Sequence, residues 1–81
     1  MTYSIIYEKI NDQSFPAGYY YAHIPALDLT THGLGIDGAR EAARDLARLW
    51  IEEKKANHEP IPIESDLLYS RIEIEDGVFS S

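Results

Sequence analysis

Alternating apolar and polar side chains near the start of the chain predict a small β-sheet. The segment from Tyr3 to Ile10 alternates with the period of two that is typical of a strand. A second strand is expected over Tyr19–Ile24, because its aromatic side chains suit a pleated sheet better than a helix. Pro25 ends that strand, since proline cannot donate a hydrogen bond to a central ladder. A short third strand over Leu29–Gly33 would complete a three-stranded meander.

The clearest predicted element is a single amphipathic helix from Ile36 to about Asn57. This stretch contains no proline and a single glycine, and its apolar residues recur at intervals of three and four, which places them on one helix face. These residues are Ile36, Ala39, Ala43, Leu46 and Trp50. Gly35 stands at the expected N-cap, and Lys54 and Lys55 lie in the last turns, where cations are favoured. The alanine-rich face would allow a close approach to a sheet.

After the helix, the pattern predicts an extended crossing segment and one more strand. Glu59–Ile63 contains two prolines and can neither continue a helix nor enter a ladder. Leu67–Glu75 alternates again and is expected to be the last strand. The predicted order is therefore βββαβ. This is an α+β fold, an antiparallel meander plus a last strand, with one helix packed on one face.

A single helix can cover only one face of such a sheet. We expect the covered face to carry Ile5, Tyr20, Ala22, Ile24, Ile72 and Ile74. The open face would carry Tyr19, Tyr21, His23, Tyr69, Arg71, Glu73 and Glu75. An uncovered face rich in rings is a candidate contact surface, although tyrosines also decorate ordinary solvent-exposed faces.

Composition narrows the class of protein. A chain of 81 residues predicts one domain with a thin core. Fourteen acidic and seven basic residues give a net charge of −7, which argues against direct binding to nucleic-acid phosphates and suits a basic partner or solubility. The absence of cysteine excludes disulfides and thiolate zinc sites. With no secretion signal and no apolar run that could span a bilayer, we expect a cytoplasmic protein without membrane contact.

The residues do not form a recognisable catalytic or cofactor-binding pattern. If the second and third strands form a hairpin, His23 and His32 lie diagonally on one sheet face, but His58 lies far along the chain and no metal-binding spacing occurs. A two-metal nuclease needs several carboxylates gathered on a central sheet, and the first strand offers only Glu8. The glycines of Gly33-Leu34-Gly35 match neither a dinucleotide fingerprint nor a P-loop, and they favour a tight turn into the helix. We therefore predict no enzymatic activity, no metal and no cofactor.

The order of several short motifs resembles the HicB antitoxin-like family. The segment Gly18–Leu27 (GYYYAHIPAL) resembles that family's "gyy-a-vP-l" stretch. Thr31-His32-Gly33, followed by the alanine-rich helix, resembles its "T-x-G" turn and helix. Glu59-Pro60-Ile61-Pro62 resembles its "g-e-p-i-P" segment after the helix. The resemblance covers roughly residues 3–75.

The resemblance implies a partial RNase H-like βββαβ domain over residues 1–81, with its core at about 3–75. Many members carry a C-terminal DNA-binding domain, which is not expected here, so direct DNA binding is not expected either. Members are antitoxins that neutralise a small, basic, mRNA-cleaving toxin with a double-stranded-RNA-binding fold. The partner implied by the resemblance is therefore a small basic HicA-like toxin. Free-standing single-domain members without an assigned partner also exist.

Three functions stay open from the sequence. The chain is an antitoxin-type protein, a stand-alone oligomeric interaction module, or a weak nucleic-acid or small-ligand binder that uses the aromatic sheet face. In each case we expect a homodimer or higher even oligomer, built on a sheet edge or on the Tyr19/Tyr21 face, because the predicted core is thin. For the antitoxin function, tyrosines would anchor the contact and carboxylates would steer the acidic chain onto a basic surface. The predicted partner-binding residues are Tyr19, Tyr21, Tyr69, Glu64, Asp66, Glu73 and Glu75.

Overall fold

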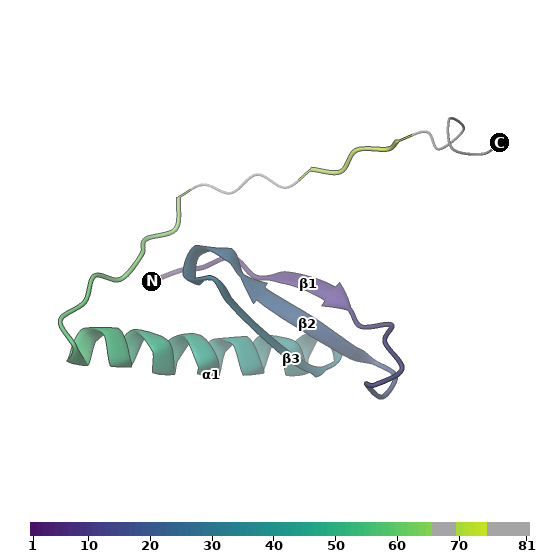
Figure 1. Ribbon diagram of the computed structural model, residues 1–81, viewed down its shortest axis with the longest axis horizontal. Coiled ribbons are helices and arrows are strands. Elements are labelled where there is room, and N and C mark those ends of the chain that lie inside the picture. The colour runs from purple at the N-terminus through teal and green to yellow at the C-terminus, as the bar shows by residue number, and fades with distance from the viewer. Residues whose placement is uncertain (66–69, 75–81) are drawn as a thin grey trace.

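The computed structural model describes residues 1–65 and 70–74 and shows an α+β arrangement of a three-stranded sheet and one long helix (Figure 1). The strands are β1 (Ile6–Lys9), β2 (Tyr19–Ile24) and β3 (Leu29–Leu34). The helix α1 spans Gly35–Ala56, within one residue of the predicted bounds at each end.

The sheet is the predicted antiparallel meander, with β2 in the centre and β1 and β3 at its two sides. Tyr7 lies opposite Ala22, and Ala22 lies opposite Thr31, so these three residues share one face. The first strand is shorter than the predicted Tyr3–Ile10. Its ladder continues by one backbone hydrogen bond of 3.0 Å from the Ile10 amide to the Tyr19 carbonyl.

A short 3-10 turn, η1 (Pro25–Leu27), separates β2 from β3. Proline ends the strand as predicted, because its ring fixes φ and it has no amide to donate. Asp28 follows with a left-handed φ of 53°, and its amide donates to the Pro25 carbonyl. Leu27 is buried, so the turn also adds an apolar side chain to the core.

The core lies between α1 and one face of the sheet and is built from small side chains. Ala22, Ala39 and Ala43 are completely inaccessible to solvent, and Ile24 and Leu27 are nearly so. Half-buried residues pack around this centre: Tyr3, Ile5, Tyr7, Tyr20, Leu29, Ala47, Trp50 and Ile51. Ile5, Tyr20, Ala22 and Ile24 therefore lie on the covered side, as the alternation predicts.

The turn from β3 into α1 depends on two glycines. Gly35 has a left-handed φ of 69°, which glycine adopts at little cost, and its amide donates to the Gly18 carbonyl at 2.8 Å. At Gly33, an added Cβ atom would overlap the backbone of Gly38 and Ala39 in the first turns of α1. The glycines therefore serve a tight turn and a close helix–sheet contact.

The C-terminal end of α1 is a Schellman motif. The Glu59 amide donates to the Lys54 carbonyl at 2.9 Å, and the His58 amide donates to the Lys55 carbonyl at 3.1 Å. His58 has a left-handed φ of 56° at the position where glycine is usual. The Lys54 ammonium also pairs with Glu59 at 3.1 Å and lies 5.1 Å from the centre of the Trp50 ring. These contacts turn the chain back toward its N-terminus.

The chain after the helix contacts the N-terminal segment. The Tyr3 hydroxyl donates to the Pro62 carbonyl at 2.6 Å. Glu64 accepts a hydrogen bond of 2.5 Å from the Ser4 amide and one of 2.8 Å from the Ser4 hydroxyl. The segment Glu59–Ile63 forms neither helix nor strand, as its prolines predict.

The predicted last strand over Leu67–Glu75 is not present in its described part. Ser70–Ile74 forms no strand, and its isoleucines Ile72 and Ile74 are 81% and 69% exposed instead of covering the sheet. Figure 1 shows this segment apart from the sheet and helix. Residues 67–69 and 75 lie outside the described residues. Alternation alone does not place a strand, because a strand also needs a free edge of the sheet in the correct register.

Within the described residues, no helix combines the length and apolar character needed to cross a membrane.

Candidate functional site

The sheet face opposite α1 carries a cluster of rings, which we call the aromatic surface. It consists of Phe15, Tyr19, Tyr21, His23 and His32. Tyr19, Tyr21 and His23 alternate along β2, and His32 lies directly opposite Tyr21 on β3. All five side chains are partly exposed. The predicted diagonal placement of His23 and His32 on one face is confirmed, because His23 lies opposite Thr30.

Phe15 lies at the centre of the aromatic surface, although it comes from the loop between β1 and β2. Its ring centroid lies 5.0 Å from that of His32 and 6.0 Å from that of Tyr21, both in edge-to-face geometry. The Tyr19 ring lies 6.1 Å from Phe15 at a tilt of 48°. Such pairs stabilise one another by about 0.5–1.5 kcal/mol beyond area burial, so the rings form an ordered cluster.

A turn at Asp12 brings Phe15 to this position. The Ser14 amide donates to the Asp12 side chain at 2.9 Å, and the Phe15 amide donates to the Asp12 carbonyl at 3.1 Å. This is the hydrogen bonding by which aspartate commonly forms turns. The Ser14 amide, helped by the Ser14 hydroxyl, lowers the pKa of Asp12 because it favours the charged carboxylate.

His23 links all three strands at the other end of the aromatic surface. Its Nε2 atom lies 3.0 Å from Oε1 of Glu8 on β1, and its Nδ1 atom lies 3.0 Å from Oγ1 of Thr30 on β3. A neutral ring can donate from Nε2 to the carboxylate and accept from the threonine hydroxyl. Both nitrogens of His23 are therefore used in structural contacts.

The aromatic surface offers apolar contact area and no group arranged for a reaction among the described residues. Its rings offer flat apolar contact area, and Ile6 and Leu34, at 41% and 61% exposure, extend that area along the two outer strands. Exposed aromatic and aliphatic side chains grouped in this way are typical of protein contact sites. Among the described residues, no three histidine, aspartate or glutamate side chains gather to hold a metal ion.

The predicted partner-binding residues are only partly brought together. Tyr19 and Tyr21 lie on the aromatic surface. Glu64 lies away from that surface, where it accepts two hydrogen bonds from Ser4. Glu73 is exposed, but it does not share a sheet face with the tyrosines, because Ser70–Ile74 forms no strand. Tyr69, Asp66 and Glu75 lie outside the described residues. Arg71, also predicted for the open face, is exposed in the same irregular segment.

Sequence reasoning missed the role of Phe15 and the apolar edge at Leu34. Phe15 is a lone aromatic residue in a loop of turn formers. Such a residue is a signal in itself, because a large apolar side chain in a polar loop usually packs onto a neighbouring element. The sequence predicts Leu34 in the turn before the helix, whereas the structure extends β3 through it.

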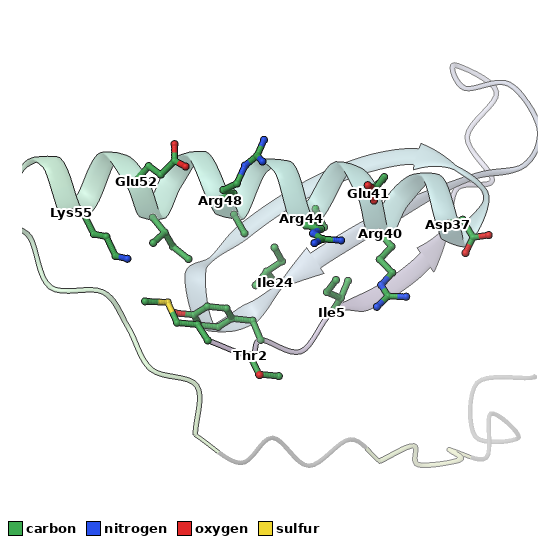
Figure 2. Close-up of a pocket in the computed structure, with 15 residues that line it drawn as sticks. Thr2, Ile5, Ile24, Asp37, Arg40, Glu41, Arg44, Arg48, Glu52 and Lys55 are labelled. Carbon is green, nitrogen blue, oxygen red and sulfur yellow. The ribbon is translucent and has the colours of Figure 1, made fainter.

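A second feature lies on the opposite side of the molecule. A groove of about 1070 Å³ lies between α1 and the first residues of the chain, and we call it the N-terminal groove (Figure 2). Its apolar lining includes Ile5, Ile24, Ala43, Ala47 and Ile51. Its charged lining comes from α1: Asp37, Arg40, Glu41, Arg44, Arg48, Glu52 and Lys55.

Comparisons with protein-family models, with curated proteins and with solved structures found no match to this chain. The observed architecture is α+β with a three-stranded antiparallel sheet and one helix.

Proposed function

We propose that this chain is a HicB-like antitoxin-type protein that binds and neutralises a small, basic, mRNA-cleaving toxin by protein–protein contact. The observation that carries the proposal is the aromatic surface, an ordered cluster of partly exposed rings on the face that α1 leaves open. The motif resemblance is the reason for proposing this family and its partial RNase H-like fold. The net charge of −7 makes the chain electrostatically complementary to a basic partner.

The contact would block RNA by occupying the toxin's RNA-binding side. A protein that binds RNA exposes lysine and arginine for the phosphates. An acidic protein is attracted to the same side chains, and Glu8 provides a carboxylate next to the rings on the open face. Rings such as Tyr21 would then anchor the complex, because aromatic side chains at the centre of an interface carry much of its binding energy.

The first test is whether a small basic open reading frame lies beside this gene, and the second is a kinetic measurement of binding to its product. Tyr21→Ala is expected to speed dissociation by roughly 5–30-fold, which corresponds to about 1–2 kcal/mol for a central aromatic anchor. Tyr21→Phe keeps the ring and should dissociate at a rate close to that of the parent chain. Leu49→Ala, on the exposed side of α1, is the control for a change away from the surface.

The proposal is wrong if the neighbouring basic protein does not bind, or if Tyr21→Ala and Leu49→Ala have the same effect. Toxin-dependent RNA cleavage, measured with and without this chain, separates simple binding from neutralisation. The chain alone should cleave neither RNA nor RNA–DNA hybrids with Mg²⁺ or Mn²⁺ supplied.

A second candidate function uses the same surface for a different ligand. Clustered rings can stack on single-stranded bases, although a net charge of −7 opposes the phosphates. Titration with single-stranded oligonucleotides at low salt distinguishes the two. Quenching of the tyrosine fluorescence would favour a nucleic-acid binder, and unchanged fluorescence would exclude it.

A further inference from the structure

We propose that the N-terminal groove receives the segment Ser70–Ile74 of a second copy of this chain, so that two chains exchange these segments in a symmetric dimer. The proposal does not depend on the antitoxin function, because it concerns the opposite side of the sheet. It rests on an apolar groove, an exposed segment with a matching apolar pattern, and the length of the connecting chain.

The floor of the groove is apolar. Ile24 and Ala43 lie beneath it and are themselves buried, whereas Ile5 and Ile51 are partly exposed. The neighbouring strand β1 is at the side of the sheet, and no described residue pairs with its outer edge. A groove with an apolar floor beside a free strand edge is suited to an added extended segment.

The proposed occupant has the matching pattern. In Ser70–Ile74, Ile72 and Ile74 alternate with Arg71 and Glu73. In an extended strand the two isoleucines would point to the same side, toward the groove floor, and Glu73 to the other. Both isoleucines are largely exposed in the single chain, at 81% and 69%. Exchange would therefore cover two large apolar side chains and the groove at the same time.

The groove carries charges of both signs. It is lined by four basic residues, Arg40, Arg44, Arg48 and Lys55, and by three acidic ones, Asp37, Glu41 and Glu52. In Figure 2, Arg40 extends from α1 toward Ile5, and Lys55 extends to the same side of the helix. The proposed occupant Ser70–Ile74 carries one arginine and one glutamate and has no net charge. The contact with the groove would therefore be mainly apolar, and charge neither favours nor opposes it.

The length of the connection from Glu64 to Ser70 favours the segment of a second copy, rather than the chain's own segment, as the occupant of the groove. Glu64 is held beside Ser4 by two hydrogen bonds. An extended path along β1 from that point would bring position 69 level with Lys9, the last residue of β1. Ser70–Ile74 would then lie beyond the strand and beyond the groove floor at Ile5. A second chain related by a two-fold axis has no such restriction, and the symmetry would fill both grooves.

Sedimentation of the full chain at tens of micromolar is the first test. We expect a species of twice the 9.2 kDa mass of one chain. The double variant Ile72→Lys, Ile74→Lys should raise the dimer dissociation constant by at least about tenfold, because it places two charges against an apolar floor. Leu49→Lys is the matched control, since Leu49 is 59% exposed on α1 but does not line the groove. A chain that stays monomeric, or a dimer unaffected by the double variant, overturns the proposal.

Mixing two variants tests the exchange itself. One partner is the segment variant Ile72→Lys, Ile74→Lys, and the other is the groove variant Ile5→Lys, Ile51→Lys. Each should be largely monomeric alone, whereas their mixture retains one intact groove and one intact segment and should recover part of the dimer. No recovery in the mixture, with each variant folded by circular dichroism, contradicts reciprocal exchange.

A cross-link identifies the contact. The chain has no cysteine, so introduced cysteines are the only thiols present. Chains with Arg44→Cys and chains with Ser70→Cys, mixed and oxidised, should give mainly the mixed disulfide dimer. If each variant instead cross-links equally well to itself, the two segments do not meet in the proposed way. A chain carrying both cysteines that closes on itself shows that its own segment fills the groove, and this also overturns the proposal.

Discussion

Gly33 faces the first turns of α1 with no side chain between the two backbones. An alanine Cβ atom there would lie 2.5 Å from the Ala39 nitrogen and closer still to the carbonyl group of Gly38. Gly38, on the helix side of the same contact, has more room, since its added Cβ would lie 3.6 Å from the nearest atom. The two glycines thus differ in what they do, although both lie at one contact.

Gly33→Ala is expected to lower the free energy of unfolding by about 1–3 kcal/mol, because the helix must move to admit the methyl group. Gly38→Ala is the control and should raise it by up to about 1 kcal/mol, since alanine is the better helix former and meets only ordinary contacts. Urea unfolding followed by circular dichroism measures both. Equal effects of the two substitutions would contradict the close contact at Gly33.

Asp12 makes a contribution to stability that depends on pH. Because its pKa is lowered in the folded chain, the charged carboxylate stabilises the fold at a pH above its unfolded pKa. That contribution is lost as the pH falls through the lower, folded pKa. We expect Asp12→Asn to be less stable than the parent chain near neutral pH, with the difference shrinking on acidification. NMR titration of the Asp12 carboxyl group gives the folded pKa directly.

The cause of this shift can be separated with Ser14→Ala. The variant keeps the Ser14 amide, which is the larger cause, and removes the hydroxyl. The pKa of Asp12 should therefore rise only part of the way toward its ordinary value. An unchanged pKa would assign the whole effect to the backbone.

At the scale of the elements, local patterns predict three strands and the helix because each of them is largely decided by its own residues. The spacing of Ala39 and Ala43 places them on the buried side of α1, and the alternation in β2 places Ala22 and Tyr21 on opposite faces. The alternation in Ser70–Ile74 does not by itself place the segment on the sheet, because strand formation also depends on pairing with another part of the molecule. The alternation in β2 also predicts Tyr19 and Tyr21 on the open face. It does not predict Phe15 there, because the turn at Asp12 brings that ring onto the sheet.

The helix end gives a prediction at this scale. His58 holds a left-handed φ in the Schellman motif, a conformation that costs a residue with a Cβ atom roughly 1–2 kcal/mol. His58→Gly removes that cost but adds freedom to the unfolded chain, so we expect a net gain of about 0.5–1 kcal/mol in the free energy of unfolding. His58→Ala keeps the strain and should bring no gain. Thermal unfolding of the three chains provides the comparison.

For the whole molecule, charge is unevenly distributed between the folded body and the chain after Asn57. If the proposed antitoxin function holds, the acidic end should act mainly on the rate of association with a basic toxin. Glu73→Lys with Glu75→Lys should slow association and flatten its salt dependence, because surface charges are screened over a Debye length of about 8 Å at physiological ionic strength. Glu52→Lys with Glu53→Lys changes the net charge equally on α1 and is the control. Unchanged rates in the first variant would exclude steering by these carboxylates.

The hydrogen bonds that join Ser4 to Glu64 have a consequence for the order of folding. They close a loop of 60 residues, and the entropy lost in closing such a loop costs about 3–4 kcal/mol by the chain-length relation. Exposed hydrogen bonds contribute only about 0.5–1.5 kcal/mol each, so these two bonds and the Tyr3–Pro62 bond together do little more than offset that cost and do not hold an unfolded chain closed. The sheet and helix must form first and bring the two ends together. We therefore expect these hydrogen bonds to form last during folding. On heating they should break first, before the sheet and α1 separate.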